Sequence, residues 1–248
     1  MTLPFDASIG VAAFMGLVVL IAAFVRGYSG FGFSALVIAA SGLVMNPLNF
    51  VAVVLICEVV MTAMQWQNVG PDVDWRRVGA LLAGAVVGLP LGLWALTSIS
   101  ADAARAVISG YILVMCLVLL RGWNFKGPVG TAGTVAAGVV SGVANAPGMA
   151  GLPVAAFFAA QTMPAAVFRA TLVAYFPILD LYSGPMYWWN GMVSWDTLWA
   201  GLWCLPLVFV GVFLGSRHFL STDPQDFRRF AIVLLAILAV LGLVKAVL

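Results

Sequence analysis

Charged residues are scarce in this chain of 248 residues, at 8%, and histidine occurs once. A soluble domain carries about 25% charged residues. A chain with 64% hydrophobic residues could not cover a water-facing surface, so its surroundings are expected to be lipid. The basic residues form no run and the net charge is only +2, which argues against nucleic acid as a partner.

Residues that could carry covalent or metal chemistry are few and dispersed. Cys57, Cys116 and Cys204 lie singly in apolar stretches, so neither a disulfide framework nor a zinc site is expected. His218 follows Arg217 in a predicted loop, and no nucleophile-and-base pattern accompanies it. We therefore expect the chain not to be an enzyme and to bind neither a metal nor a cofactor.

Long apolar runs are what the chain has in abundance. Hydropathy and breaker residues mark ten runs, which predicts an all-α polytopic membrane protein. The second and seventh runs are too short to cross a bilayer, because a spanning helix needs about 20 residues. The runs cover residues 8–25, 33–44, 48–66, 78–96, 104–120, 129–143, 152–160, 165–182, 198–215 and 227–247.

The two halves of the chain, about 1–122 and 128–248, repeat one another within a single domain 1–248. Each half has a glycine-rich break after its first run, and Pro47 and Pro164 follow the short second runs. Because each half has an odd number of runs, the second copy is expected to be inverted, as in many secondary transporters. In that architecture broken or re-entrant helices of the two halves meet near the bilayer midplane, where the substrate binds.

The distribution of arginine and lysine predicts the orientation in the membrane. Cytoplasmic loops carry the excess of these residues. With both termini outside, only Arg105 and Lys245 fall outside. The basic residues that fall inside are Arg76, Arg77, Arg121, Lys126, Arg217, Arg228 and Arg229. We expect a bacterial inner membrane protein with both termini in the periplasm.

The first break, at residues 26–34, has the character of an anion site. A helix that begins after the glycines directs unpaired N–H groups, and the positive end of its dipole, into the break. The alternative is that the glycines only allow close packing of the backbone. The residues expected to bind substrate here are Arg26, Tyr28, Ser29, Gly30, Gly32 and Ser34.

The second break supplies the counterpart through Asn145, Pro147, Gly148 and Gly151, and Arg169 follows in the eighth run. A guanidinium suits bidentate binding of sulfonate, sulfite or carboxylate oxygens. For Arg26 the alternative is a structural ion pair or an interfacial position. For Arg169 the alternative is an anchor that reaches to the cytoplasmic face of the membrane.

Two acidic residues lie inside apolar runs. Glu58 is near the centre of the third run, which makes it a candidate for coupling transport to an ion, or the counter-charge of Arg26. Asp180 lies beside Tyr182 near the outer end of the eighth run, so it is expected at the membrane interface.

On these motifs the chain resembles the TauE/SafE family of sulfite and organosulfonate transporters. The resemblance rests on the breaks at 27–32 and 142–148, on the prolines that follow them, and on the sequence Arg169-Ala170-Thr171. It covers nearly the whole chain and implies an ion-coupled secondary transporter with alternating access. The implied substrate is sulfite or an organosulfonate such as sulfoacetate or taurine.

The chain departs from the family pattern where bulky residues replace glycine. Phe31, Phe33 and Met149 leave less bare backbone and would form an apolar wall for an organic substituent. A carboxylate as the transported anion, and a non-transporting membrane partner subunit, stay open as alternatives. The expected partners are the bilayer, a small anionic solute and a coupling ion, either proton or sodium. A homodimer is left open.

Overall fold

The computed structural model describes residues 3–65, 70–121, 129–219, 236–237 and 240, and all regular structure in these ranges is helical. The expected tenth run, 227–247, lies almost wholly outside the described residues, together with Lys126, Arg228, Arg229 and Lys245. The helices are α1 (Ile9–Ser29), α2 (Phe33–Val44), α3 (Val51–Gln65), α4 (Trp75–Thr97), α5 (Ala101–Arg121), α6 (Thr131–Asn145), α7 (Gly151–Ala159), α8 (Ala165–Trp189) and α9 (Trp195–Phe219). Short 3-10 turns precede α1, α3 and α4: η1 (Pro4–Asp6), η2 (Pro47–Phe50) and η4 (Gly70–Asp72).

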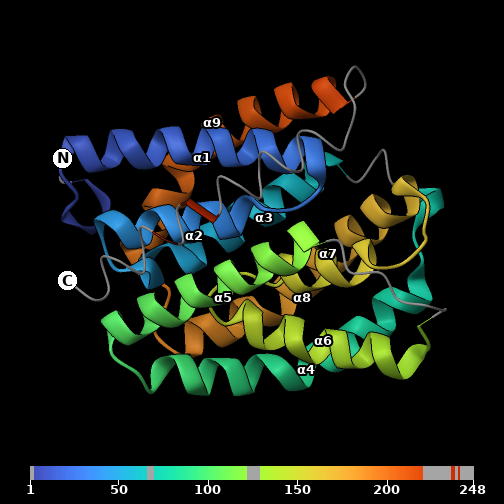
Figure 1. Cartoon of the computed structure of the whole chain (residues 1–248). Coiled ribbons are helices and arrows are strands. Elements are labelled where there is room, and N and C mark those ends of the chain that lie inside the picture. Colours follow the sequence, from blue (N-terminus) through green and yellow to red (C-terminus); the bar gives the residue numbers. More distant parts are fainter. Residues whose placement is uncertain (1–2, 66–69, 122–128, 220–235, 238–239, 241–248) are drawn as a thin grey trace.

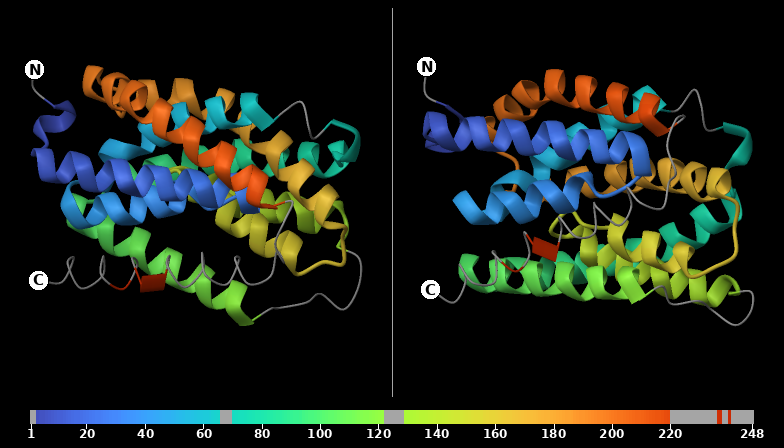
Figure 2. Two further views of the ribbon diagram at one scale, coloured as in Figure 1. Left: turned by 90° about the horizontal axis from the view of Figure 1, so that it is seen from above. Right: turned by 45° about the horizontal axis from the view of Figure 1, so that its top comes forward.

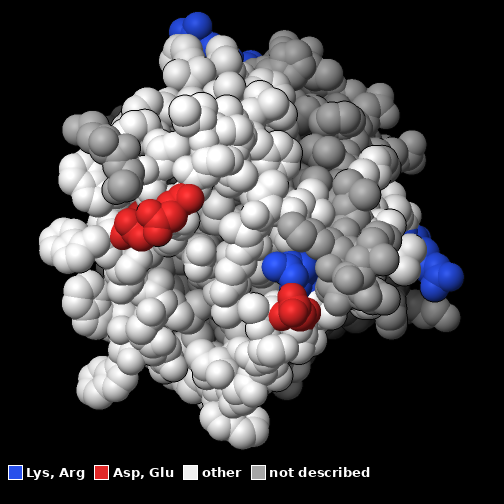
Figure 3. Space-filling view, turned by 90° about the vertical axis from the view of Figure 1, so that its left-hand side faces the viewer, with Lys and Arg blue, Asp and Glu red and all other residues white. Residues whose placement is uncertain are grey.

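Six helical segments of the described chain are long and apolar enough to cross a membrane. They are Ile9–Tyr28, Pro47–Gln65, Trp75–Thr97, Ala101–Arg121, Ala166–Trp189 and Trp195–Arg217. Their outward faces expose large apolar side chains, among them Trp94, Leu117 and Leu181. The described part of the end of the molecule in Figure 3 is mostly uncharged, with a few acidic and basic side chains. The prediction of a polytopic, all-α membrane protein is therefore confirmed.

The two helices that follow the breaks are short, as expected. At about 1.5 Å per residue, the 12 residues of α2 reach about 18 Å and the 9 residues of α7 about 14 Å, well below a hydrocarbon core of about 30 Å. In Figure 1, α1 runs from left to right and α2 returns, whereas α6 runs from right to left and α7 returns. The two bent hairpins thus enter the bundle from opposite ends. This is the arrangement that inverted halves require, although the duplication itself stays a prediction.

Glycines in the left-handed region occur at both breaks. Gly30 caps α1 with φ 83°, and its N–H donates to the carbonyl oxygen of Arg26. Gly32 precedes α2 with φ 96°, and Gly148 has φ 76° in the second break. Residues with a Cβ rarely adopt this conformation. The sequence therefore fixes where the chain turns, since few other residues could occupy these positions.

Each half of the chain packs against a helix of the other half, α1 along α9 and α4 along α6 (Figure 2). Glycine makes both contacts possible. A Cβ on Gly88 would lie 2.1 Å from the carbonyl oxygen of Val139, and one on Gly215 would lie 2.2 Å from that of Phe24. Each pair runs parallel, since the residues in contact advance along both helices together. Small residues allow membrane helices this close approach.

Three helices extend four or more residues beyond their expected ends, and one of them is α9, which continues past residue 215 to Phe219. Helix α1 continues past residue 25 to Ser29, so Arg26 belongs to its last turn. Helix α8 continues past residue 182 to Trp189, even though Pro177 and Pro185 lie inside it. The extension of α8 moves its acidic residue, Asp180, away from the helix end and into the bundle.

Candidate functional site

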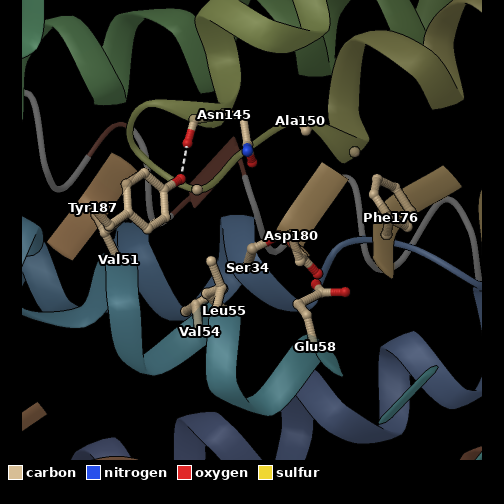
Figure 4. Close-up of a pocket in the computed structure, with 12 residues that line it drawn as sticks. Ser34, Val51, Val54, Leu55, Glu58, Asn145, Ala150, Phe176, Asp180 and Tyr187 are labelled. Carbon is tan, nitrogen blue, oxygen red and sulfur yellow. Dashed lines mark hydrogen bonds between the residues drawn. The ribbon is translucent and has the colours of Figure 1, made fainter. Parts of the chain in front are cut away.

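A buried pocket lies where the two breaks meet (Figure 4). Its volume is about 20 Å³, which is room for one water molecule. Helix α3, the second break and α8 form most of its wall, and α2 contributes one residue. The lining residues are Ser34 of α2, Val51, Val54, Leu55 and Glu58 of α3, Asn145, Gly148, Ala150 and Gly151 of the second break, and Phe176, Asp180 and Tyr187 of α8.

Two helix amino termini open onto this pocket. Ser34 lies in the first turn of α2, and Gly151 is the first residue of α7. The breaks also touch each other, because a Cβ on Gly151 would lie 3.9 Å from the Cβ of Phe31. The first N–H groups of a helix have no partner within it, and its dipole places positive charge there. The pocket therefore has two positive helix ends, which favour an anion.

Arg26 is fully buried at the edge of the pocket. Its Nε donates to Oε2 of Glu58 at 3.4 Å, Nη1 donates to the carbonyl oxygen of Gly30, and its guanidinium carbon lies 5.2 Å from the centre of the Phe176 ring. Nη2 is buried and has no hydrogen-bond partner in the described part of the chain. Arg26 is thus a structural ion-pair partner of Glu58 and still has a donor to offer.

Arg169 lies against the first break. Its Nη2 donates to the carbonyl oxygen of Gly27 at 3.3 Å, and its Cγ would lie 3.2 Å from a Cβ on Gly30. The side chain is half-buried and reaches toward α1 rather than along the membrane surface. The first break is therefore held from two sides, by Arg26 within α1 and by Arg169 across from α8.

The other predicted residues shape the breaks without lining the pocket. Tyr28 is buried within α1, Gly32 provides the turn into α2, and Pro147 lies in the second break. The side chain of Ser29 lies outside what the structure describes. Among the predicted site residues, the pocket is lined by Ser34, Asn145, Gly148 and Gly151 together with Glu58.

The expectation for Asp180 is wrong: it is 8% exposed and lines the pocket instead of lying at the interface. Figure 4 shows its carboxyl group turned toward that of Glu58. Its Oδ2 has no hydrogen-bond partner within the described residues. The signal that could have found it is the uncharged stretch after Tyr182, which lets α8 continue and carries the aspartate inward. Tyr187 of the same helix was missed for the same reason. Phe176 lies within the expected run, but an apolar ring there gives no signal of a site.

Hydroxyl groups from α6 and α8 hold the second break. The Tyr187 hydroxyl donates to the carbonyl oxygen of Asn145. The Ser141 hydroxyl donates to the carbonyl oxygen of Ala150 at 3.0 Å. Its Oγ also lies 2.8 Å from the Tyr175 hydroxyl. In each break, side chains thus satisfy carbonyl groups that the interrupted helix leaves free. The amide nitrogen of the Asn145 side chain is buried and finds no partner among the described residues.

Tyr187→Phe should lower the free energy of unfolding by about 1–2 kcal/mol, because the Asn145 carbonyl loses its donor inside the bundle. Thermal unfolding of the purified protein in detergent measures the change. Tyr111→Phe is the matched control, since the Tyr111 hydroxyl is buried without a hydrogen-bond partner in the described structure. Removing it should be neutral or stabilising. Equal losses in the two variants would show that the Tyr187 bond does not hold the break.

Together these features define a class of protein: a multi-pass α-helical membrane protein in which broken helices enclose a polar pocket, the architecture of secondary transporters. The family model described as Sulfite exporter TauE/SafE matches residues 15–241, and the chain belongs to this family. Membership makes it a transporter of sulfite- or sulfonate-type anions. Comparison with curated proteins and with solved structures gave no match.

Proposed function

We propose that the chain is a secondary transporter that moves sulfite or a small organosulfonate across the inner membrane by ion-coupled alternating access. The observation that carries the proposal is the convergence of the α2 and α7 amino termini on one pocket beside a buried arginine. Sulfite and sulfonate groups present several negative oxygens around one sulfur. Backbone N–H groups and a guanidinium are donors suited to such oxygens.

The substrate would bind between the breaks. Arg26 would offer its unpartnered Nη2, and Ser34, Asn145, Gly148 and Gly151 line the space beside it. Tyr28, Ser29, Gly30, Gly32, Pro147 and Arg169 would keep the breaks in shape rather than bind directly. Glu58 would respond to the substrate, because Arg26 would donate to the anion from Nη2 while it donates to Glu58 from Nε.

The small volume of the pocket has a mechanistic meaning under this proposal. About 20 Å³ admits a water molecule but not a sulfonate. Binding therefore requires the surrounding helices to separate on one side of the membrane. Alternating access supplies such separation on each side in turn. The structure would then correspond to the closed form between the two open ones.

The orientation in the membrane is proposed from the described arginines. Arg76 and Arg77 lie at the start of α4, Arg121 at the end of α5 and Arg217 near the end of α9. In Figure 1 these helix ends lie away from the amino terminus. The excess of basic residues favours that side as cytoplasmic, with the amino terminus in the periplasm. A periplasmic carboxyl terminus and a homodimer remain predictions.

Sulfite or an organosulfonate should stabilise the purified protein against thermal unfolding. A ligand that binds only the folded state at 100 times its dissociation constant stabilises it by about 2.7 kcal/mol. Sulfite, methanesulfonate, sulfoacetate, taurine and acetate are compared at matched concentrations in detergent. Arg217→Ala is the control variant, because Arg217 is exposed and packs on Phe213 outside the pocket.

A stronger response to acetate than to any sulfur compound would favour a carboxylate transporter. No response to any of these anions, with no flux in proteoliposomes, would contradict transport and favour a partner subunit. Arg217→Ala is expected to keep whichever anion response the unaltered protein shows.

A further inference from the structure

Two buried carboxyl groups face each other across the pocket. Glu58 comes from α3 and Asp180 from α8, two helices that pack together, and each residue is only 8% exposed. Figure 4 shows their carboxyl groups turned toward one another. Glu58 is held by Arg26, whereas Oδ2 of Asp180 has no hydrogen-bond partner within the described chain.

The charges around the pocket do not balance if both carboxyl groups are ionised. Arg26 from α1 is the cation that contacts Glu58, and Asp180 interacts electrostatically with both Glu58 and Arg26. One positive and two negative charges would leave a net negative charge inside the bilayer. Such a charge is costly at membrane depth. Like charges held close together favour a state in which the pair shares one proton.

Other groups near the pair do not supply the missing charge. On α8, Tyr187 donates to Asn145, and Tyr175 bonds to Ser141. Arg169 lies on the far side of Arg26, with which it interacts electrostatically, and it donates to the carbonyl oxygen of Gly27. It is 11 residues before Asp180, about 16 Å along the helix.

The other packed helices add no cation either within the part of the chain that the structure describes. Helix α2, the second break and α7 present no ionisable side chain to the pocket. On α3, Cys57 is a buried thiol that interacts with Cys204 of α9. On α4, which also packs on α8, Arg77 is engaged with Asp74, Gln161 and Phe158.

We propose that Glu58 and Asp180 together form the proton site of the transporter, holding one proton when the pocket is empty and a second when an anion is bound. The inference rests on the proposed function. Without substrate, the positive Arg26 balances one remaining carboxylate. A monovalent anion that engages Arg26 brings one further negative charge, and a proton from the aqueous side to which the pocket is open joins the carboxylate. The loaded pocket is again neutral, so one proton accompanies each monovalent anion that binds.

The pair differs from a single coupling residue in what each variant should do. If Glu58 alone carried the coupling proton, Glu58→Gln would abolish proton uptake. In the pair, Asp180 becomes the carboxylate that balances Arg26 in Glu58→Gln, and it takes up the proton when the anion binds. In Asp180→Asn, Glu58 is the remaining carboxylate, so it balances Arg26 and takes up the proton when the anion binds. Only removal of both carboxyl groups, in Glu58→Gln with Asp180→Asn, eliminates the proton site.

The experiment counts protons taken up per anion bound. Methanesulfonate is added to purified protein in weakly buffered detergent solution, a pH indicator reports the protons, and calorimetry reports the bound anion. The expected count is about one for the unaltered protein, for each single variant and for the control Asp102→Asn, whose side chain is exposed. For the double variant the expected count is zero.

Three results would overturn the proton pair. They are anion binding without proton uptake by the unaltered protein, binding that requires sodium in place of protons, and loss of uptake in Glu58→Gln alone. Anion binding without proton uptake by the unaltered protein overturns the pair even where a variant fails to fold. Absence of methanesulfonate binding together with absence of sulfite binding would instead contradict the proposed function, so the two failures are distinguishable.

Discussion

Arg26→Ala should abolish anion transport and lower the free energy of unfolding by about 3–5 kcal/mol, the usual cost of leaving one partner of a buried ion pair without the other. Arg26 is fully buried, and its removal leaves Glu58 without its cation and Gly30 without the donor to its carbonyl. Sulfite flux into proteoliposomes and thermal unfolding in detergent measure the two effects.

A second variant separates the structural role of Arg26 from its role in binding. Arg26→Ala combined with Glu58→Gln removes both charges of the pair, so much of the lost stability should return while flux stays absent. Arg217→Ala serves as the control for loss of an arginine outside the pocket. If Arg26→Ala unfolded at the temperature of the unaltered protein and still transported sulfite, the ion pair and the proposed anion donor would both be refuted.

Gly88→Ala should lower the free energy of unfolding by about 2 kcal/mol or more and impair transport, because overpacking a tight contact forces the backbone to move. The added Cβ would lie 2.1 Å from the carbonyl oxygen of Val139. The two helices must then move apart, and α6 ends at Asn145 beside the pocket. Thermal unfolding and sulfite flux are measured as before.

Gly110→Ala is the matched control for this substitution. A Cβ on Gly110 of α5 meets nothing within 4 Å, and alanine is the better helix former by up to about 1 kcal/mol. The two substitutions make the same chemical change and should alter stability in opposite directions. Similar thermal unfolding midpoints for the two variants would mean that α4 and α6 accommodate the added methyl group without loss of stability.

The sequence predicted the breaks because their cause is local. Gly30, Gly32 and Gly148 adopt backbone conformations that favour glycine, so the positions of the turns can be read from the residues themselves. The lengths of α2 and α7 follow from the prolines and glycines around them. The ends of α1 and α8 were placed too early, although glycines follow both: Gly30 caps α1, and Gly191 comes after α8 with φ 71°. Gly27 stays helical where a break was expected, and it packs against the backbone of Val212 on α9.

The residues that line the pocket could be predicted only in part, because tertiary contacts bring them together. The pairing of Arg26 with Glu58 was one of two alternatives for each residue, and the sequence could not choose between them. The choice depends on how α1 and α3 lie relative to each other. Asp180 was misplaced because its position depends on the length of α8 and on its packing against α3. Tertiary contacts, rather than the residues near each acid, decide which groups meet.

The packing of α1 on α9 and of α4 on α6 constrains the order in which the bundle can assemble during synthesis. A ribosome delivers α1 and α4 to the membrane well before α6 and α9, so their contact faces must first be covered by lipid or by other proteins. In each of these two contacts, one helix belongs to the first half of the chain and the other to the second half. The bundle therefore reaches its final packing only after the ninth helix has been inserted, and a nascent chain arrested midway would have neither contact in place.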